Sequence, residues 1–239
     1  MTKDDVLCDS KPIYAIVPAA GIGSRMQHTS AKQYLPLQGQ AILSHTLSRL
    51  IAHPSIAQVI VALHPDDTHF DNLPESKHPK ITKVTGGESR AESVLAALAA
   101  IQEQSVWAMV HDAARPCLTS EDIDKMCACL SPDVEGVVLG MPVKDTMKRV
   151  SSGGSIEQTV DRAGLWHALT PQIFANQALY HAIEDALKKH HPITDESSAM
   201  EYQGIHPTML QGRFDNIKIT YPNDLAIADM FLMEQEKEE

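Results

Sequence analysis

The sequence predicts an α/β protein with a mostly parallel central sheet, and three observations support this class. Short apolar runs rich in β-branched residues have the composition of buried strands. These runs alternate along the chain with segments whose apolar residues recur at helical spacing. Turn residues such as Gly, Pro and Asp separate the two kinds of segment. Because strands joined through a helix lie parallel, we expect helices on both faces of the sheet.

In the first part of the chain, apolar runs predict five buried strands. They lie at residues 13–17, 58–63, 81–85, 106–110 and 134–141. Amphipathic stripes between them predict helices at 42–51 and 91–102, and Ser120, followed by two acidic residues, predicts a further helix start. The segment His64-Pro65-Asp66-Asp67 interrupts the second strand and is expected to begin a short helix.

Between Val143 and Gln172 the alternation of strands and helices is interrupted. Residues 146–150 and 156–160, joined by Ser151-Ser152-Gly153-Gly154-Ser155, predict a β-hairpin. We interpret this hairpin as an arm that packs on a second subunit of a two-fold dimer. A flap over the protein's own site fits the pattern equally well.

The last part of the chain returns to mixed elements. They are helices at 178–189, from Thr194-Asp195-Glu196 through Tyr202, and at 222–233, and strands at 208–211 and 216–220. We therefore predict one domain at 12–233 that includes the arm at about 142–166. A flexible N-terminus at 1–11 and a frayed acidic tail at 234–239 are expected to flank it.

The composition narrows the class of partner. The 239 residues are 43% hydrophobic and 21% charged, as in an ordinary globular protein. The formal net charge of −11 argues against nucleic acid or an anionic membrane as the main partner. The N-terminal segment lacks the apolar core of a signal peptide, and no run reaches the ~18 apolar residues of a membrane span. Four cysteines without disulfide or zinc spacing predict reduced thiols and a cytoplasmic location.

The loop after the first strand, Pro18-Ala19-Ala20-Gly21-Ile22-Gly23-Ser24-Arg25-Met26, is the strongest candidate for a ligand site. Its glycines allow a ligand to approach the backbone, and Arg25 and Lys32 add two cations that suit a polyphosphate. It is not a P-loop, and Met26 at the third glycine position disfavours a dinucleotide fingerprint. A nucleoside triphosphate loop and a tight turn with surface cations remain as alternatives.

Two other unusual loops also follow predicted strands, at Gly86-Gly87 and at His111 to Pro116. Ligands of parallel sheets bind at the carboxyl ends of the strands, so the three loops together favour a functional site over a simple turn.

Asp112 is the sharpest single candidate, because it directly follows a buried strand. An aspartate in this position is able to hold a Mg²⁺ ion that bridges triphosphate oxygens. A helix cap or an ion pair with Arg115 is the alternative. Asp215 is a second candidate ligand, with an Asx turn as the alternative. Lys218 lies in the alternation Ile217-Lys218-Ile219, where an exposed lysine is the default expectation.

Motifs spread from about residue 12 to about residue 233 resemble those of the 2-C-methyl-D-erythritol 4-phosphate cytidylyltransferase family. They are Pro18 to Met26, Lys32-Gln33-Tyr34, Val110 to Pro116, Pro142 to Arg149, Thr159 to Arg162, Leu165 to Gln172, Thr194 to Glu196 and Asp215 to Thr220. The resemblance implies a Rossmann-like three-layer nucleotidyltransferase fold with a projecting arm. It implies transfer of CMP from CTP to 2-C-methyl-D-erythritol 4-phosphate with release of pyrophosphate, an isoprenoid precursor step. It also implies a homodimer in which one subunit's arm completes the other's site.

The resemblance further implies a role for each candidate residue. The catalytic cations are Arg25, Lys32 and Lys218, and Asp112, with Asp215 as a second candidate, binds Mg²⁺. The nucleotide-binding residues are Pro18, Ala19, Ala20, Gly21, Gly23, Gly87, Glu88 and Ser93, and Glu88 is expected to act through its backbone because close relatives often have aspartate there. The substrate phosphate is expected to contact Arg115, Thr170 and, from the neighbouring arm, Thr146 and Arg162.

Three other functions are weighed against this one. Ribitol 5-phosphate cytidylyltransferase shares the CTP loop and differs mainly in the alcohol pocket. A nucleotide-binding regulatory protein has no need of the full set of Arg25, Lys32, Asp112 and Lys218, which disfavours it. A nicotinamide dehydrogenase is disfavoured by the missing third glycine.

Overall fold

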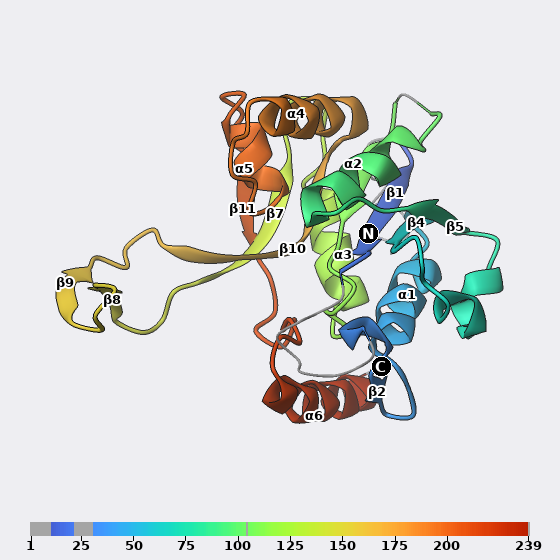
Figure 1. Cartoon of the computed structure of the whole chain (residues 1–239), viewed down its shortest axis with the longest axis horizontal. Helices are drawn as coiled ribbons and strands as arrows, with labels where there is room; N and C mark the ends of the chain where they lie inside the picture. The colour runs from blue at the N-terminus through green and yellow to red at the C-terminus, as the bar shows by residue number, and fades with distance from the viewer. Residues whose placement is uncertain (1–10, 22–30, 104, 239) are drawn as a thin grey trace, which may run out of the picture.

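The structure of the protein is a computed structural model that describes residues 11–21, 31–103 and 105–238. A seven-stranded sheet forms its centre, in the order β11-β7-β10-β6-β1-β4-β5 (Figure 1). Six of these strands are parallel, and β10 runs antiparallel to its neighbours β6 and β7. The strands are β1 (Ile13–Ala19), β4 (Ile56–Leu63), β5 (Ile81–Thr85), β6 (Trp107–Val110), β7 (Val137–Pro142), β10 (Trp166–Ala175) and β11 (Thr208–Gln211).

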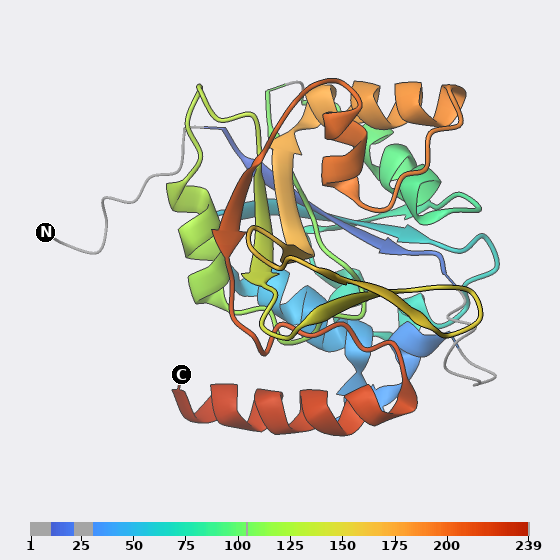
Figure 2. The same cartoon turned by 90° about the vertical axis from the view of Figure 1, so that its left-hand side faces the viewer.

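Helices cover both faces of the sheet, so the protein has three layers (Figure 2). On one face lie α1 (Ile42–Ala52) and α3 (Ser120–Ala128), and on the other lie α2 (Arg90–Ala99), α4 (Asn176–Lys188) and α5 (Glu196–Glu201). Neighbouring side chains of a strand enter opposite clusters: Val17 belongs to the cluster of Leu47 from α1, and Ile16 to that of Val94 from α2. The prediction of an α/β protein with a mostly parallel sheet is thus confirmed.

The last helix, α6 (Pro222–Glu238), lies apart from these layers. Its Ala228 and Leu232 pack in a third cluster with Ile42 and Ile219. Pro222 is the first residue of the helix, as predicted, but the helix continues past the predicted end at Met233 into the segment expected to fray. The residues predicted as a flexible N-terminus lie, except for Lys11, outside the described part of the chain.

Two small antiparallel pairs complete the fold. The first joins β2 (Pro36–Leu37) to β3 (Gln40–Ala41). The second, β8 (Met147–Val150) with β9 (Ile156–Val160), is the predicted hairpin, and Figure 1 shows it projecting from the body of the protein. Apolar side chains are exposed along this arm and at its base: Met147, Val150, Ile156, Leu165 and Trp166.

Local sequence explains where the helices near the site begin. Ser89 caps α2: its hydroxyl accepts from the Glu92 N–H, and the Glu92 carboxylate accepts from the Ser89 N–H. Asp195 caps α5 in the same way, as the sequence predicts. α3 begins at Ser120 as predicted, but its capping hydroxyl belongs to Thr119.

The sequence analysis missed one strand, and two of its predictions about the elements were wrong. The missed strand is β10, which runs antiparallel in the interior of the sheet. Residues 216–220 form no strand in the described structure; Ile219 N donates instead to Ala114 O at 2.9 Å, which ties this extended segment to the loop after β6. His64 to Asp67 is a turn rather than a helix start.

Candidate active site

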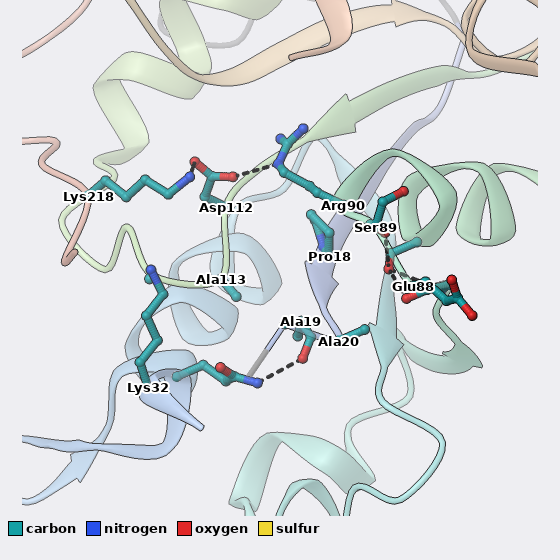
Figure 3. A pocket seen from close by; sticks show the side chains of 15 residues that line it. Pro18, Ala19, Ala20, Lys32, Glu88, Ser89, Arg90, Asp112, Ala113 and Lys218 are labelled. Carbon is teal, nitrogen blue, oxygen red and sulfur yellow. Dashed lines mark hydrogen bonds and ion pairs between the residues drawn. The ribbon is translucent and has the colours of Figure 1, made fainter. Parts of the chain in front are cut away.

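A pocket lies at the carboxyl ends of β1 and β6, beside the N-terminus of α2 (Figure 3). The predicted loops converge there, as expected for a parallel sheet. Its lining residues come from five segments: Pro18 to Gly21, Lys32 with Gln33, Gly87 to Arg90 with Ser93, Asp112 to Ala114, and Lys218. Gly23 and Arg25 fall outside the described residues.

Gln33, which the sequence analysis did not select as a site residue, fixes the conformation of the first of these segments. The Gln33 amide is buried and donates to the carbonyl oxygen of Ala19 at 2.8 Å. This bond fixes the direction of the peptide that follows β1, because a buried carbonyl needs a partner. Gln33 belongs to the short 3-10 helix Lys32–Tyr34, so the same turn places Lys32 at the pocket.

The turn before α2 is packed against the β1 loop. A Cβ atom on Gly86 would lie 2.7 Å from the Cβ of Ala20, so only glycine allows this approach. A Cβ atom on Gly87 would lie 2.3 Å from the Cβ of Glu92. The Ser93 hydroxyl accepts from Gly87 N–H at 3.1 Å and donates to Ser89 O at 2.9 Å. Ser93 therefore shapes the turn that was predicted to frame the nucleotide.

Asp112 is the electrostatic centre of the pocket. Its Oδ1 accepts from Arg90 Nε at 3.0 Å, and its Oδ2 lies 3.2 Å from Arg115 Nε and 2.9 Å from Lys218 Nζ. Burial alone would raise the pKa of this carboxyl group, but Arg90, Lys218 and Arg115 hold the pKa well below its usual range. The ion pair with Arg115, an alternative to the metal role, is thus present in this structure.

His111 and Thr170 hold the backbone of Asp112 in place. The Asp112 N–H donates to Thr170 Oγ1 at 3.0 Å, so the hydroxyl hydrogen is available for His111 Nδ1, 3.1 Å away. His111 Nε2 then carries the proton and donates to the carbonyl oxygen of Arg115 at 3.0 Å. Burial lowers the pKa of His111 to about 4, which agrees with a neutral ring.

The two predicted contacts of the substrate phosphate on the body of the protein lie beneath the pocket. Arg115 is almost fully buried, and its Nη1 donates to Asn216 O at 2.8 Å. Thr170 is also buried, and its carbonyl oxygen accepts from the Asn216 amide at 2.9 Å. Neither residue lines the pocket itself, but both touch Asp112, which does.

Arg90 and Glu196 form a second part of the network that sequence reasoning missed. The guanidinium group of Arg90 donates through Nη1 and Nη2 to the two carboxylate oxygens of Glu196, at 2.7 and 3.0 Å. Glu196 is fully buried at the start of α5. The two residues are 106 positions apart, so no local spacing in the sequence signals this pair.

Two lysines face the same region from different segments. Lys218 lines the pocket with its ammonium group on Asp112, so it is not simply an exposed strand lysine. Lys32 Nζ donates to the carbonyl oxygen of Ile219 at 3.0 Å, next to Lys218 in the chain. Figure 3 shows both lysine side chains on the side of the pocket away from Glu88 and Ser89.

The pocket fits a magnesium ion through one carboxylate. Asp112 is the acidic side chain that reaches it beside the two lysines, and Mg²⁺ bound to a nucleotide commonly uses one or two carboxylates together with phosphate oxygens and water. Among the described residues, no group of three or more His, Cys, Asp or Glu side chains is placed to share a metal ion.

Asp215, the second predicted ligand, does not line the pocket. Its carboxylate is buried and accepts from Arg213 at 2.8 Å and from the Gln235 amide at 3.0 Å. These bonds turn it toward α6, so a magnesium site in this pocket rests on Asp112 among the two candidates.

Thr146 and Arg162 lie on the arm and at its base, away from the pocket lining. Both side chains are exposed, and Arg162 donates to the carbonyl oxygen of Lys144. In the described structure neither side chain is bonded to Arg115, whose guanidinium group contacts Asp112 and Asn216. Outside the site, the helices of the described chain lack the length and apolar composition needed to cross a bilayer.

Comparisons with known proteins agree over almost the whole chain. The family model described as IspD, 2-C-methyl-D-erythritol 4-phosphate cytidylyltransferase, matches residues 13–234. A protein of that name from Shewanella amazonensis is 55% identical over 229 residues, which cover 95% of this chain and 96% of the relative. One from Shewanella oneidensis is 56% identical over 224 residues, 94% of this chain and 90% of the relative.

Solved structures agree as well. The crystal structure of a 4-diphosphocytidyl-2C-methyl-D-erythritol synthase has a TM-score of 0.81 and 34% identity, covering 93% of this chain and 99% of the other. The 2-C-methyl-D-erythritol 4-phosphate cytidylyltransferase of Francisella tularensis has a TM-score of 0.79 and 33% identity, covering 92% of this chain and all of the other.

Proposed function

This chain belongs to the 2-C-methyl-D-erythritol 4-phosphate cytidylyltransferase family, and we propose how its residues carry out the reaction of that family. The protein is a nucleotidyltransferase of isoprenoid precursor synthesis: it transfers CMP from CTP to 2-C-methyl-D-erythritol 4-phosphate and releases pyrophosphate. We assign the reaction to the pocket where Lys32, Asp112 and Lys218 lie beside the N-terminus of α2, and this arrangement is the main observation behind the assignment.

The chemistry requires charge neutralisation more than proton transfer. The nucleophile is a phosphate oxygen that is already mostly ionised near neutral pH, since its second pKa is about 6, so no general base is needed. Two polyanions have to meet, and negative charge develops around the α-phosphorus as the new bond forms. Fixed cations and correct positioning are therefore the main sources of rate.

We assign these cations by their place around the pocket. Lys32 and, from the sequence, Arg25 hold the triphosphate next to the Pro18 to Gly21 backbone. Lys218 moves from Asp112 to the α-phosphate when CTP binds. The turn at Gly87 and Glu88, shaped by Ser93, frames the base through its backbone.

Asp112 would hold the Mg²⁺ ion that accompanies CTP. When bound, the ion neutralises charge on the phosphates that separate during the reaction. The carboxylate is suited to this role because its low pKa keeps it ionised at any physiological pH. Asp215 is assigned no part in metal binding, because it does not line the pocket and its bonds to Arg213 and Gln235 turn its carboxylate toward α6.

We place the substrate phosphate on the side of Asp112 that Arg115 and Thr170 support from beneath the pocket, where the arm of a second subunit would reach it. Arg115 and Thr170 flank Asp112 in one chain, whereas Thr146 and Arg162 are exposed on the arm. An isolated two-stranded hairpin is marginally stable in water, and this one exposes apolar side chains such as Ile156 and Val150. A homodimer that covers the arm explains both features and makes the site composite. We place the enzyme in the cytoplasm, where the thiols of Cys117, Cys127 and Cys129 stay reduced.

The test of the function is pyrophosphate release with CTP, Mg²⁺ and one polyol phosphate at a time. We expect release with 2-C-methyl-D-erythritol 4-phosphate and little with ribitol 5-phosphate. Release with ribitol 5-phosphate alone would overturn the substrate, and CTP binding without any release would indicate a regulatory protein.

A further inference from the structure

The pair Arg90 and Glu196 has no part in the reaction as described so far, yet Arg90 lines the pocket and Glu196 holds it from behind. Arg90 is the first residue of α2 and lines the pocket, while Glu196 is the first residue of α5 and is fully buried. A fully buried carboxylate is costly unless its oxygens are paired, and both oxygens of Glu196 accept from Arg90. This is the bidentate geometry that arginine, and not lysine, is able to supply.

Arg90 uses a different edge of its guanidinium group to reach Asp112. Its Nε donates to Asp112 Oδ1 at 3.0 Å while Nη1 and Nη2 are held by Glu196. The planar group therefore bridges two carboxylates in a fixed direction. The other oxygen, Asp112 Oδ2, is the one shared by Lys218 and Arg115.

The position of Glu196 is itself fixed from the sheet. Gln172 of β10 donates through its amide to Asp195 Oδ2 at 2.9 Å and accepts from the Ser197 N–H at 2.9 Å. These bonds lie on both sides of Glu196 in the chain, so they anchor the first turn of α5 to the central sheet. The rigid path runs from β10 through α5 to Arg90 and then to Asp112.

We propose that Glu196 and Arg90 are positioning residues that hold Asp112 Oδ1, so that the carboxylate keeps its direction when Lys218 leaves Oδ2 for the nucleotide. The inference rests on the proposed function, because it assumes that the Asp112 carboxylate oriented by Arg90 would bind the Mg²⁺ ion that accompanies CTP. Without Glu196, Arg90 is free to turn, and the carboxylate loses a fixed partner on Oδ1. Partners that orient a metal ligand typically change metal affinity or activity 10- to 100-fold when they are replaced.

The variants that test this are Glu196→Gln, Arg90→Lys and the double variant. Glu196→Gln keeps the size of the side chain but removes the charge, and Arg90→Lys keeps the charge but removes the planar bridge. The control is Glu184→Gln, which removes a carboxylate from an exposed ion pair with Lys188 on α4. Thermal unfolding of each variant reports whether the fold is retained.

The deciding readout is CTP affinity by calorimetry, with Mg²⁺ and with EDTA. In the presence of Mg²⁺, we expect both single variants to bind CTP about tenfold more weakly than the wild type, or weaker still. In the presence of EDTA, their affinity for CTP should change little. A lesion that only loosened the fold would weaken both affinities equally. The double variant should lose no more CTP affinity than the more impaired of the two single variants, since both residues act through one bridge.

The turnover rate gives an independent check. We expect kcat with saturating substrates to fall about 10- to 100-fold in Glu196→Gln and Arg90→Lys, and to stay unchanged in Glu184→Gln. Wild-type kcat and a wild-type effect of Mg²⁺ on CTP binding in Arg90→Lys would overturn the proposal, even if Glu196→Gln failed to fold. A wild-type protein that binds CTP but releases no pyrophosphate would instead contradict the proposed function, and the calorimetry would still decide the role of the pair.

Discussion

The ammonium group of Lys218 lies 2.9 Å from Oδ2 of Asp112, and this contact joins the segment before α6 to the loop after β6. This contact pairs the cation that we propose for the α-phosphate with the carboxylate that we propose for the metal ion. The predictions below follow from this arrangement and from the groups that support it.

Replacing either triphosphate cation should nearly abolish turnover while the fold survives. We expect Lys32→Ala and Arg25→Ala to lower kcat by about 10²–10³, because each removes a fixed positive charge from the reacting phosphates. The measurement is pyrophosphate release at saturating CTP. Lys83→Ala, which removes a lysine from an exposed pair with Asp71, is the matched control. Near-normal turnover in either variant contradicts the assigned role.

Replacing Asp112 by Asn should destabilise the ligand-free protein. The change leaves Arg90, Arg115 and Lys218 close together with one fewer negative charge, and removal of one partner from a buried ion pair costs on the order of 3 kcal/mol. Urea unfolding at neutral pH measures this loss. Pyrophosphate should stabilise the variant, since its charge replaces the carboxylate. A variant as stable as the wild type without any anion would show that the network carries no net stability.

The neutral state of His111 predicts a loss of stability in mild acid. Its pKa is lowered by burial from 6.5 to about 4, so the unfolded chain takes up a proton between these values while the folded chain does not. The free energy of unfolding should therefore fall by up to about 3 kcal/mol as the pH drops from 6.5 to 4. The contribution of Asp112 is largely retained in this window, because its loss begins only as the carboxyl group of the unfolded chain protonates near its ordinary pKa of 3.8, and it continues down toward the lowered pKa of the folded protein.

The control for this pH dependence is His111→Gln, which is able to donate to the Arg115 carbonyl but does not titrate. Urea unfolding at several pH values should give a shallower slope for the variant over the same window. Equal slopes for the two proteins would assign the acid sensitivity to other groups, such as His53, whose pKa is also lowered by burial.

Two inactive variants should restore activity when they are mixed, if the arm completes a neighbour's site. Lys32→Ala damages the body of the site, and Arg162→Ala damages the arm. A mixed dimer has one pocket with both residues intact, so an equal mixture that has exchanged subunits should regain about a quarter of wild-type activity. The measurement is pyrophosphate release after dissociation and reassociation. A mixture that stays inactive, or a monomeric mass by ultracentrifugation, contradicts the composite site.

The parts of the fold that the sequence predicts are those with a simple period. β5 and β11 lie where the apolar runs place them, and α1 differs from its predicted range by one residue. The sequence analysis did not predict β10 because Pro171 and polar residues such as Gln172 interrupt its apolar run. Proline also lacks the N–H that a central strand needs. The structure accommodates this with a shift of the β7 pairing between Ala168 and Gln172. At 216–220 the alternation of apolar and polar residues predicts a strand that does not form, because the apolar residues of this segment pack against α6.

The same reasoning explains what was found of the site. Lys32, Asp112 and Lys218 were identifiable because their motifs have a known chemical role, and all three line the pocket. Arg90 and Glu196 were missed because their pairing depends on how α2 and α5 meet across the sheet, which no local pattern encodes. Asp215 had a suitable residue type but faces a different set of neighbours.

The network around Asp112 also bears on which anions the resting enzyme admits. Arg90, Arg115 and Lys218 already have internal counter-ions in Asp112 and Glu196, so these three cations offer little uncompensated charge to chloride or to a single phosphate. A ligand has to displace Asp112 from Lys218 before it gains that cation, and a nucleoside triphosphate with its own divalent ion supplies both replacements at once. We therefore expect the Asp112 carboxylate to disfavour binding of chloride or of a single phosphate at Lys218 in the ligand-free enzyme.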